Sequence, residues 1–150
     1  MERELTIVTG PGPLTGRLGK TLSAALAGLE ARLYRRGEPL ENRRILFAFS
    51  LPGSGVNPEL WALLARLRDH PGCLRGSVGG VIVDGAGDLY TKAAGRDLIL
   101  AAHLAGCAFP GRPLAEATGD LRNFTVQAKN ADCGLETAYR LAVRDLAERV

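Results

Sequence analysis

Short apolar runs and stretches with helical spacing follow one another along this chain. The apolar run 4–8 and the nearly all-apolar run 44–51 predict buried strands. A weaker strand is expected at 31–36, where apolar and polar residues alternate, and a fourth at 76–85. A short fifth strand is expected near 114–117, between proline-broken segments.

Helical patterns separate these runs. Leucines and alanines recur at helical spacing from Arg17 to Leu29. Three later helices have a candidate N-cap residue each: Asn57 (followed by Pro58 at the first helical position), Thr91 (for a helix to about Gly106) and Asp132. Strands that alternate with helices predict a parallel sheet with helices on both faces.

Three glycine-rich segments each leave the carboxyl end of a predicted strand and enter a helix. They read TGPGPLTG, SLPGSGVNP and DGAGDLYT. In open parallel sheets, ligands bind at the carboxyl ends of the strands, beside the point where strand order reverses. We therefore expect the three loops to meet at one ligand site.

The composition fits one soluble domain spanning residues 1–150. The chain is 46% hydrophobic and 23% charged, and no apolar run approaches the 18 residues of a membrane span. The N-terminus MERELTIV does not resemble a signal peptide. Three widely spaced cysteines suggest neither a disulfide framework nor a zinc site, so we expect a reducing, cytoplasmic compartment and no metal.

The charge balance gives only a weak indication of partners. The net charge is +3, and five arginines surround the second predicted strand: Arg32, Arg35, Arg36, Arg43 and Arg44. A solvated sheet edge explains this cluster better than a nucleic acid does, because Tyr34 is the one aromatic residue among the arginines. Neither a nucleic acid nor a membrane is expected as a partner.

The first loop was compared with three kinds of phosphate loop. A Walker A loop is rejected, because Leu14 stands where its first glycine is required before the GKT at 19–21. A dinucleotide-binding GxGxxG loop is a weak alternative: Thr15 replaces its last glycine, although Arg35 or Arg36 could meet a 2′-phosphate. A loop for one terminal phosphate fits best, because threonine hydroxyls and glycine N–H groups supply its donors.

At this point the sequence resembles the flavodoxin-like NAD(P)H-dependent FMN reductases. The stretch IVTGPGPLTGRLGKTL is similar to their first loop, and LFAFSLPGSGVNPELWALLARL to their third strand and flavin-ring loop. The stretch VGGVIVDGAGDLYTKAAGRDLILAAHLAGC resembles their fourth strand, glycine loop and helix. The resemblance covers about residues 4 to 107; residues 108–132 match nothing in the family pattern.

The resemblance implies an FMN-binding flavoprotein with NAD(P)H as co-substrate, in which hydride passes to the flavin. The alternation of elements and the three aligned loops predict a three-layer α/β fold with five parallel strands in the order 2-1-3-4-5, and the resemblance implies that it is flavodoxin-like. Family members are often dimers, so a homodimer is one partner to test. The cofactor-binding residues are expected to be Thr9, Gly10, Gly12, Leu14, Thr15 and Gly16 in the first loop, Leu51, Pro52, Gly53, Ser54, Gly55 and Val56 in the second, and Gly85, Ala86, Gly87 and Tyr90 in the third.

No side chain is assigned as catalytic, because the flavin carries the chemistry in such proteins. His70 is expected to be a solvated or helix-ending residue, and His103 a structural one. Trp61 is interpreted as core. Asp84 and Asp88 are expected to shape a turn or cap a helix rather than to bind a metal.

Two classes of function remain open for this sequence. One is an FMN-dependent oxidoreductase, and the other is a non-catalytic flavodoxin-like module that binds a small anion or a partner protein. An NADP-binding domain is a weaker third.

Overall fold

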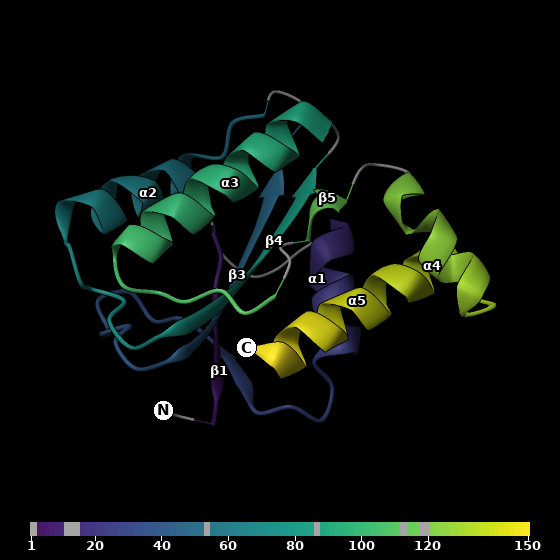
Figure 1. Ribbon diagram of the computed structural model, residues 1–150, viewed down its shortest axis with the longest axis horizontal. Coiled ribbons are helices and arrows are strands. Elements are labelled where there is room, and N and C mark those ends of the chain that lie inside the picture. The colour runs from purple at the N-terminus through teal and green to yellow at the C-terminus, as the bar shows by residue number, and fades with distance from the viewer. Residues whose placement is uncertain (1–2, 11–15, 53–54, 86–87, 112–113, 118–120) are drawn as a thin grey trace.

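The five strands form one parallel sheet (Figure 1). The structure is a computed structural model that describes residues 3–10, 16–52, 55–85, 88–111, 114–117 and 121–150. The strand order β2-β1-β3-β4-β5 confirms the predicted order, and every pairing is parallel. The strands are β1 (Leu5–Val8), β2 (Ala31–Leu33), β3 (Arg44–Leu51), β4 (Val78–Gly85) and β5 (Leu114–Ala117).

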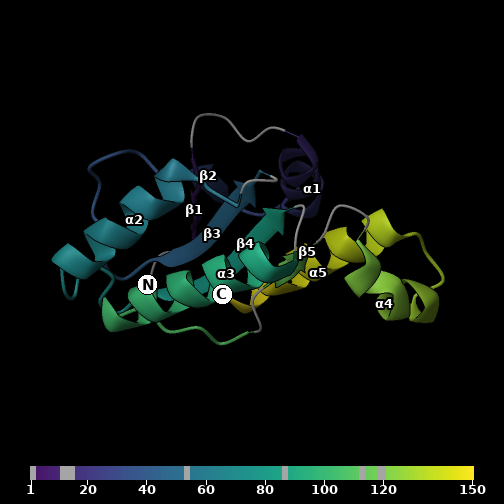
Figure 2. The same cartoon turned by 90° about the horizontal axis from the view of Figure 1, so that it is seen from above.

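Helices cover both faces of the sheet (Figures 1 and 2). α2 (Pro58–Asp69) and α3 (Asp88–Leu104) pack on one face, and α1 (Gly16–Ala25) and α5 (Leu135–Arg149) on the other. The short α4 (Thr125–Asn130) lies beside the start of α5 and follows a 3₁₀ turn at Arg122–Phe124. No helix in the described ranges is long and apolar enough to cross a membrane.

β3 is apolar at nearly every position, and helices cover both of its faces. Leu46 and Ala48 belong to the hydrophobic cluster under α1 and α5, whereas Ile45, Phe47 and Phe49 belong to the cluster under α2 and α3. Side chains of a strand point alternately to its two faces. A strand with helices on both faces therefore needs apolar residues throughout.

Two predictions about helices were wrong in detail. α1 ends at Ala25, although Leu26 and Leu29 continue to pack against the same core. Trp61 is 65% exposed and does not belong to the core. The buried face of α2 consists of Leu60, Leu63 and Leu67, and Trp61 lies about 100° around the helix from Leu60.

Two predicted N-caps were also wrong. Thr91 lies inside α3, which begins at Asp88, and its side chain is fully buried. Asp132 has a φ of +51° and follows the end of α4, where the N–H groups of Asp132 and Cys133 donate to the carbonyls of Lys129 and Ala128. This is a Schellman ending, in which an aspartate tolerates the left-handed conformation. The N-cap of α5 is Gly134.

The arginines at the edge where β1 and β3 begin are largely structural. Arg32 pairs with Glu4 at 2.8 Å and with Glu38 at 2.7 Å. Arg44 donates to the carbonyls of Val150 at 2.7 Å and Ala147 at 3.0 Å, which fastens the end of α5 to the start of β3. These contacts agree with the prediction that the arginines belong to the edge of the sheet.

Candidate functional site at the carboxyl edge of the sheet

The chain leaves β1, β3 and β4 at the same edge of the sheet, as parallel pairing requires. Thr9 and Gly10 follow β1 and are half-buried. Gly10 lies against α2, because a Cβ placed on it would stand 2.8 Å from Cβ of Glu59. Gly12, Leu14 and Thr15 lie outside the described residues.

α1 presents its first turn at this edge. Gly16 is exposed, with a φ of +66°, and a Cβ placed on it would meet none of the described atoms within 4 Å. The first N–H groups of a helix have no partner within it, and the helix dipole adds positive potential there. This end of α1 can therefore bind an anion.

The second loop is fixed at both ends by Asn57. The Asn57 side chain accepts hydrogen bonds from the N–H groups of Glu59 and Leu60, and its Nδ2 donates to the carbonyl of Ser50 at 2.9 Å. Asn57 is 5% exposed, and the sequence correctly predicts its capping role. The cap thus ties the start of α2 to the end of β3.

The predicted residues of this second loop differ in what they can offer a ligand. Leu51 is buried in the core, so its backbone alone can face the site, whereas Pro52 and Val56 are exposed. The N–H of Gly55 donates to the carbonyl of Pro52 at 2.8 Å. Gly53 and Ser54 lie outside the described residues.

Tyr90 covers the second loop from α3. A Cβ on Gly55 would stand 2.6 Å from Cγ of Tyr90, and the φ of Gly55 is +76°, so no side chain fits there. The Tyr90 ring is nevertheless 51% exposed. The Tyr90 ring therefore packs directly on the Gly55 backbone and still leaves about half of its surface open.

The third loop begins at Gly85, the last residue of β4. Gly85 is buried, and a Cβ on it would stand 2.5 Å from Cγ2 of Thr91 and 3.2 Å from Cβ of Leu51. This glycine is required by packing between β3, β4 and α3. Ala86 and Gly87 lie outside the described residues.

A polar cluster at the start of α1 was missed by sequence reasoning. Arg17 Nε donates to Asp84 Oδ2 at 3.0 Å, Arg17 Nη2 donates to Asp84 Oδ1, and the Tyr139 hydroxyl donates to Asp84 Oδ2 at 3.2 Å. The Asp84 side chain is only 9% exposed. The hydrogen bond to Asp84 raises the pKa of Arg17 above its usual value, and burial followed by the Asp84 charge raises that of Tyr139.

This cluster joins α1, β4 and α5 and holds the start of α1 at the carboxyl edge. The Arg17 guanidinium also lies 5.9 Å from the centroid of the Tyr139 ring. A charged residue at the end of an otherwise apolar strand was the signal that could have indicated such a partner. The sequence gives no means of choosing Arg17 and Tyr139, which are 67 and 55 residues away.

The histidines offer no acid or base to this edge. His70 ends α2, with its backbone N–H and its ring Nδ1 both near the carbonyl of Arg66, as the sequence indicated. His103 is exposed on the last turn of α3 and is not the buried structural residue expected. Within the described ranges, no three His, Cys, Asp or Glu side chains are grouped to hold a metal ion.

Comparison with known proteins shows the fold. The chain is similar to a short-chain flavodoxin associated with a PDU bacterial microcompartment, with 14% identity and a TM-score of 0.55 over 95% of this chain and 97% of the other. It is also similar to a flavodoxin of Streptococcus pneumonia TIGR4, with 18% identity and a TM-score of 0.53 over 93% and 98%. No protein-family model and no curated protein matches the chain. The flavodoxin-like fold predicted from the sequence is thereby confirmed.

Proposed function

We propose that this protein is an FMN-binding flavoprotein that carries electrons, and that it acts as an NAD(P)H-dependent oxidoreductase in the cytoplasm. The observation that carries the proposal is that β1, β3 and β4 end at one edge of a flavodoxin-like sheet, where the start of α1 is exposed and the Tyr90 ring packs on Gly55. In parallel α/β sheets this edge, next to the switch in strand order at β1 and β3, is where ligands bind.

The phosphate of FMN would bind at the start of α1. The exposed backbone of Gly16 leaves room there, and the helix dipole favours a dianion. Thr9 is close in sequence to this turn, and Gly12 and Thr15 are the predicted donors between them. Arg17 is held by Asp84, so it serves here to position the helix.

The flavin ring would lie against the second and third loops. Val56 is 49% exposed and Tyr90 is 51% exposed, so both can cover an apolar ring. Pro52 and Gly55 supply backbone in the second loop, and the absence of a side chain on Gly55 lets the Tyr90 ring pack there. One aromatic partner holds a ring less tightly than two, since each aromatic pair adds about 0.5–1.5 kcal/mol. We therefore expect modest, exchangeable binding.

FMN, when bound, supplies the redox chemistry. The residues of this chain bind its phosphate, orient its ring and limit the access of water to one of its faces. Such a task needs no acid or base side chain at the edge. This agrees with the positions of His70 and His103 away from it.

The proposal is tested by titrating the apo-protein with FMN and with riboflavin while flavin fluorescence is followed. FMN should bind at least tenfold more tightly, because riboflavin lacks the phosphate. Thr15→Ala should weaken FMN binding by one to two orders of magnitude, since a hydrogen bond to a charged group contributes about 1.5–3 kcal/mol. Gly12→Val should weaken it at least as much, because valine resists positive φ and fills the loop.

Two controls make the titration specific. Ser23→Ala, an exposed change on α1, should leave FMN affinity unchanged. Lys20→Ala should change it little, because Lys20 is one turn beyond the helix start. Equal binding of riboflavin and FMN, or loss of binding in Lys20→Ala with none in Thr15→Ala, would contradict this placement of the phosphate.

The oxidoreductase part is tested by NADH and NADPH consumption with and without FMN. We expect consumption that requires FMN and falls in Thr15→Ala. FMN binding without any consumption would exclude the reductase and leave an electron carrier.

A further inference from the structure

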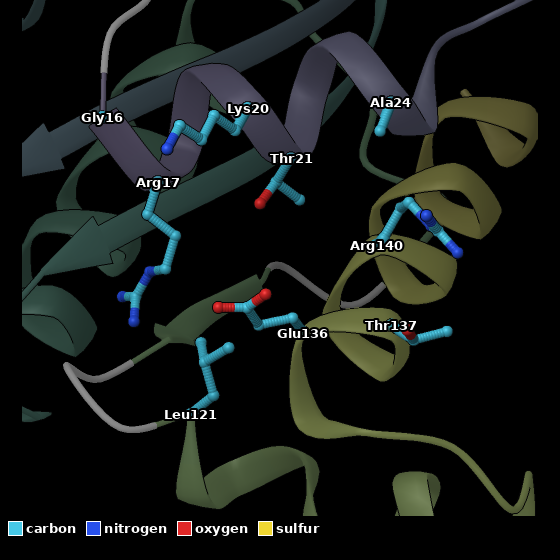
Figure 3. A pocket seen from close by; sticks show the side chains of 9 residues that line it. All are labelled: Gly16, Arg17, Lys20, Thr21, Ala24, Leu121, Glu136, Thr137 and Arg140. Atoms are coloured by element: carbon cyan, nitrogen blue, oxygen red, sulfur yellow. The ribbon is translucent and has the colours of Figure 1, made fainter.

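A cavity lies between α1, which lines it from Gly16 to Ala24, and the first turns of α5 (Figure 3). Its volume is about 390 Å³. Small-molecule sites in proteins commonly have volumes of roughly 300–1,000 Å³. α1 and α5 run in the same direction, both with their N-terminal ends at the carboxyl edge of the sheet, so the two helix dipoles make this end of the cavity positive.

The walls of the cavity carry charges of both signs together with hydroxyl groups. α1 contributes Arg17, Lys20 and Thr21, and α5 contributes Glu136, Thr137 and Arg140. In Figure 3, Glu136 extends from α5 toward Arg17 and Thr21, whereas Thr137 and Arg140 lie toward the other end.

Lys20 and Arg140 make no hydrogen bond or ion pair with any residue in the described ranges. Glu136 makes no hydrogen bond there either, but its charge interacts with that of Arg17. Arg17 differs, because its guanidinium is already bound to Asp84. Charged groups that line one cavity without pairing to each other remain able to bind a ligand.

The position of Glu136 limits which ligand can enter. A carboxylate that faces the middle of the cavity repels a bare anion, but it accepts hydrogen bonds from neighbouring hydroxyl groups. Lys20 attracts a phosphate at the other side of the same space. Thr21 and Thr137 are half-buried and can donate or accept.

We infer that this cavity is a second ligand site, separate from the flavin site, which binds a small phosphorylated sugar. The phosphate lies at the Lys20 side, and the sugar hydroxyls donate to Glu136 and contact the two threonines and Arg140. The inference does not depend on FMN binding.

The site is tested by following backbone amide signals in ¹⁵N–¹H NMR spectra while ribose 5-phosphate, ribose or inorganic phosphate is added. Ribose 5-phosphate should shift the signals of residues 16–21 and 135–140. It should bind at least tenfold more tightly than either inorganic phosphate or ribose, because it alone satisfies both Lys20 and Glu136.

Two variants separate the contributions. Lys20→Met should weaken ribose 5-phosphate binding about tenfold and leave ribose unchanged. Glu136→Gln should also weaken ribose 5-phosphate, but it should strengthen inorganic phosphate, because the repelling charge is gone. Lys129→Met, which removes an exposed charge on α4 outside the cavity, is the matched control and should change neither.

A last titration distinguishes this site from the flavin site. Ribose 5-phosphate should still bind when FMN is saturating, and displacement by FMN would overturn the assignment of a separate site. Inorganic phosphate binding as tightly as ribose 5-phosphate, or Glu136→Gln strengthening both ligands, would overturn the assignment of a sugar phosphate. If FMN fails to bind, the proposed function is wrong, and the two variants still decide this inference.

Discussion

The two edges of the sheet use charged residues differently. At the edge where β1 and β3 begin, Glu38 accepts hydrogen bonds from both Arg32 and the backbone N–H of Arg35, and Arg43 lies 3.6 Å away. At the edge where these strands end, Lys20, Glu136 and Arg140 line a cavity without such partners among the described residues.

The difference separates a structural edge from a binding edge. Paired charges at the first edge hold β2 and the turn after it against the residues that precede β1 and β3. At the second edge the strongly held group is Asp84, which fixes the start of α1 and leaves the other polar groups available. Charges that hold the fold therefore lie at both ends of the strands, whereas the charges that can hold a ligand lie at the end where the cavity is.

The largest effect is expected from Arg17→Met. The change leaves the Asp84 carboxylate, 9% exposed, without its cation, and breaking a buried ion pair in this way costs about 3–5 kcal/mol. Arg17 itself is 28% exposed, so we expect a loss of about 2–3 kcal/mol in the free energy of unfolding, measured by urea denaturation. Adding Asp84→Asn to this variant should recover part of the loss, and strictly additive losses would show that the two groups act independently.

A smaller loss is expected from Asn57→Ala at the same edge. It removes the N-cap of α2 and the hydrogen bond to Ser50, so the free energy of unfolding should fall by about 1–2 kcal/mol. Asn57→Asp keeps the cap and loses the Nδ2 donor, and should lie between wild type and alanine. If alanine costs no more than aspartate, the cap contributes little here.

Glu38→Gln tests the structural edge through its pH dependence. The hydrogen bond from Arg32 lowers the pKa of Glu38 to about 2 from a usual value near 4.5. The pKa is lowered on folding, so the stabilisation is complete above about pH 4.5 and disappears as the pH falls toward 2. After solvent screening we expect a difference of about 1 kcal/mol between wild type and variant at pH 7.

Urea denaturation at several pH values measures this difference. It should shrink between pH 4.5 and 2. A constant difference over that range would mean that Glu38 acts through packing rather than through its charge.

The smallest effect on stability is expected from Lys20→Met at the binding edge. Lys20 is exposed and pairs with no described residue, so the free energy of unfolding should change by less than about 0.5 kcal/mol. A loss as large as that of Glu38→Gln in the same denaturation experiment would remove the contrast between the two edges.

The sequence by itself determined the five strands, the four longer helices and their order along the chain, but not α4. Both ends of β3 were predicted correctly. Helices cover both faces of this strand, so it is apolar along its length, and such a run can be recognised in the sequence alone. The cap at Asn57 was predicted for the same reason, since a cap and its helix are neighbours in the chain. The alternation of elements predicted a parallel sheet, which brings strand ends of one kind, and with them the three glycine-rich segments, to one edge.

Only the tertiary structure decided which way individual side chains face and which distant charges meet. Trp61 and Leu60 are equally apolar neighbours, and the rotation of α2 against the sheet buries one and exposes the other. Asp132 ends α4 instead of starting α5, because the N–H groups of Asp132 and Cys133 complete the end of a helix that the sequence pattern did not predict. The Arg17–Asp84–Tyr139 cluster joins residues from α1, β4 and α5, and which of many charged residues meet depends on how those elements pack. Periodicity describes one element at a time, whereas these contacts form between elements.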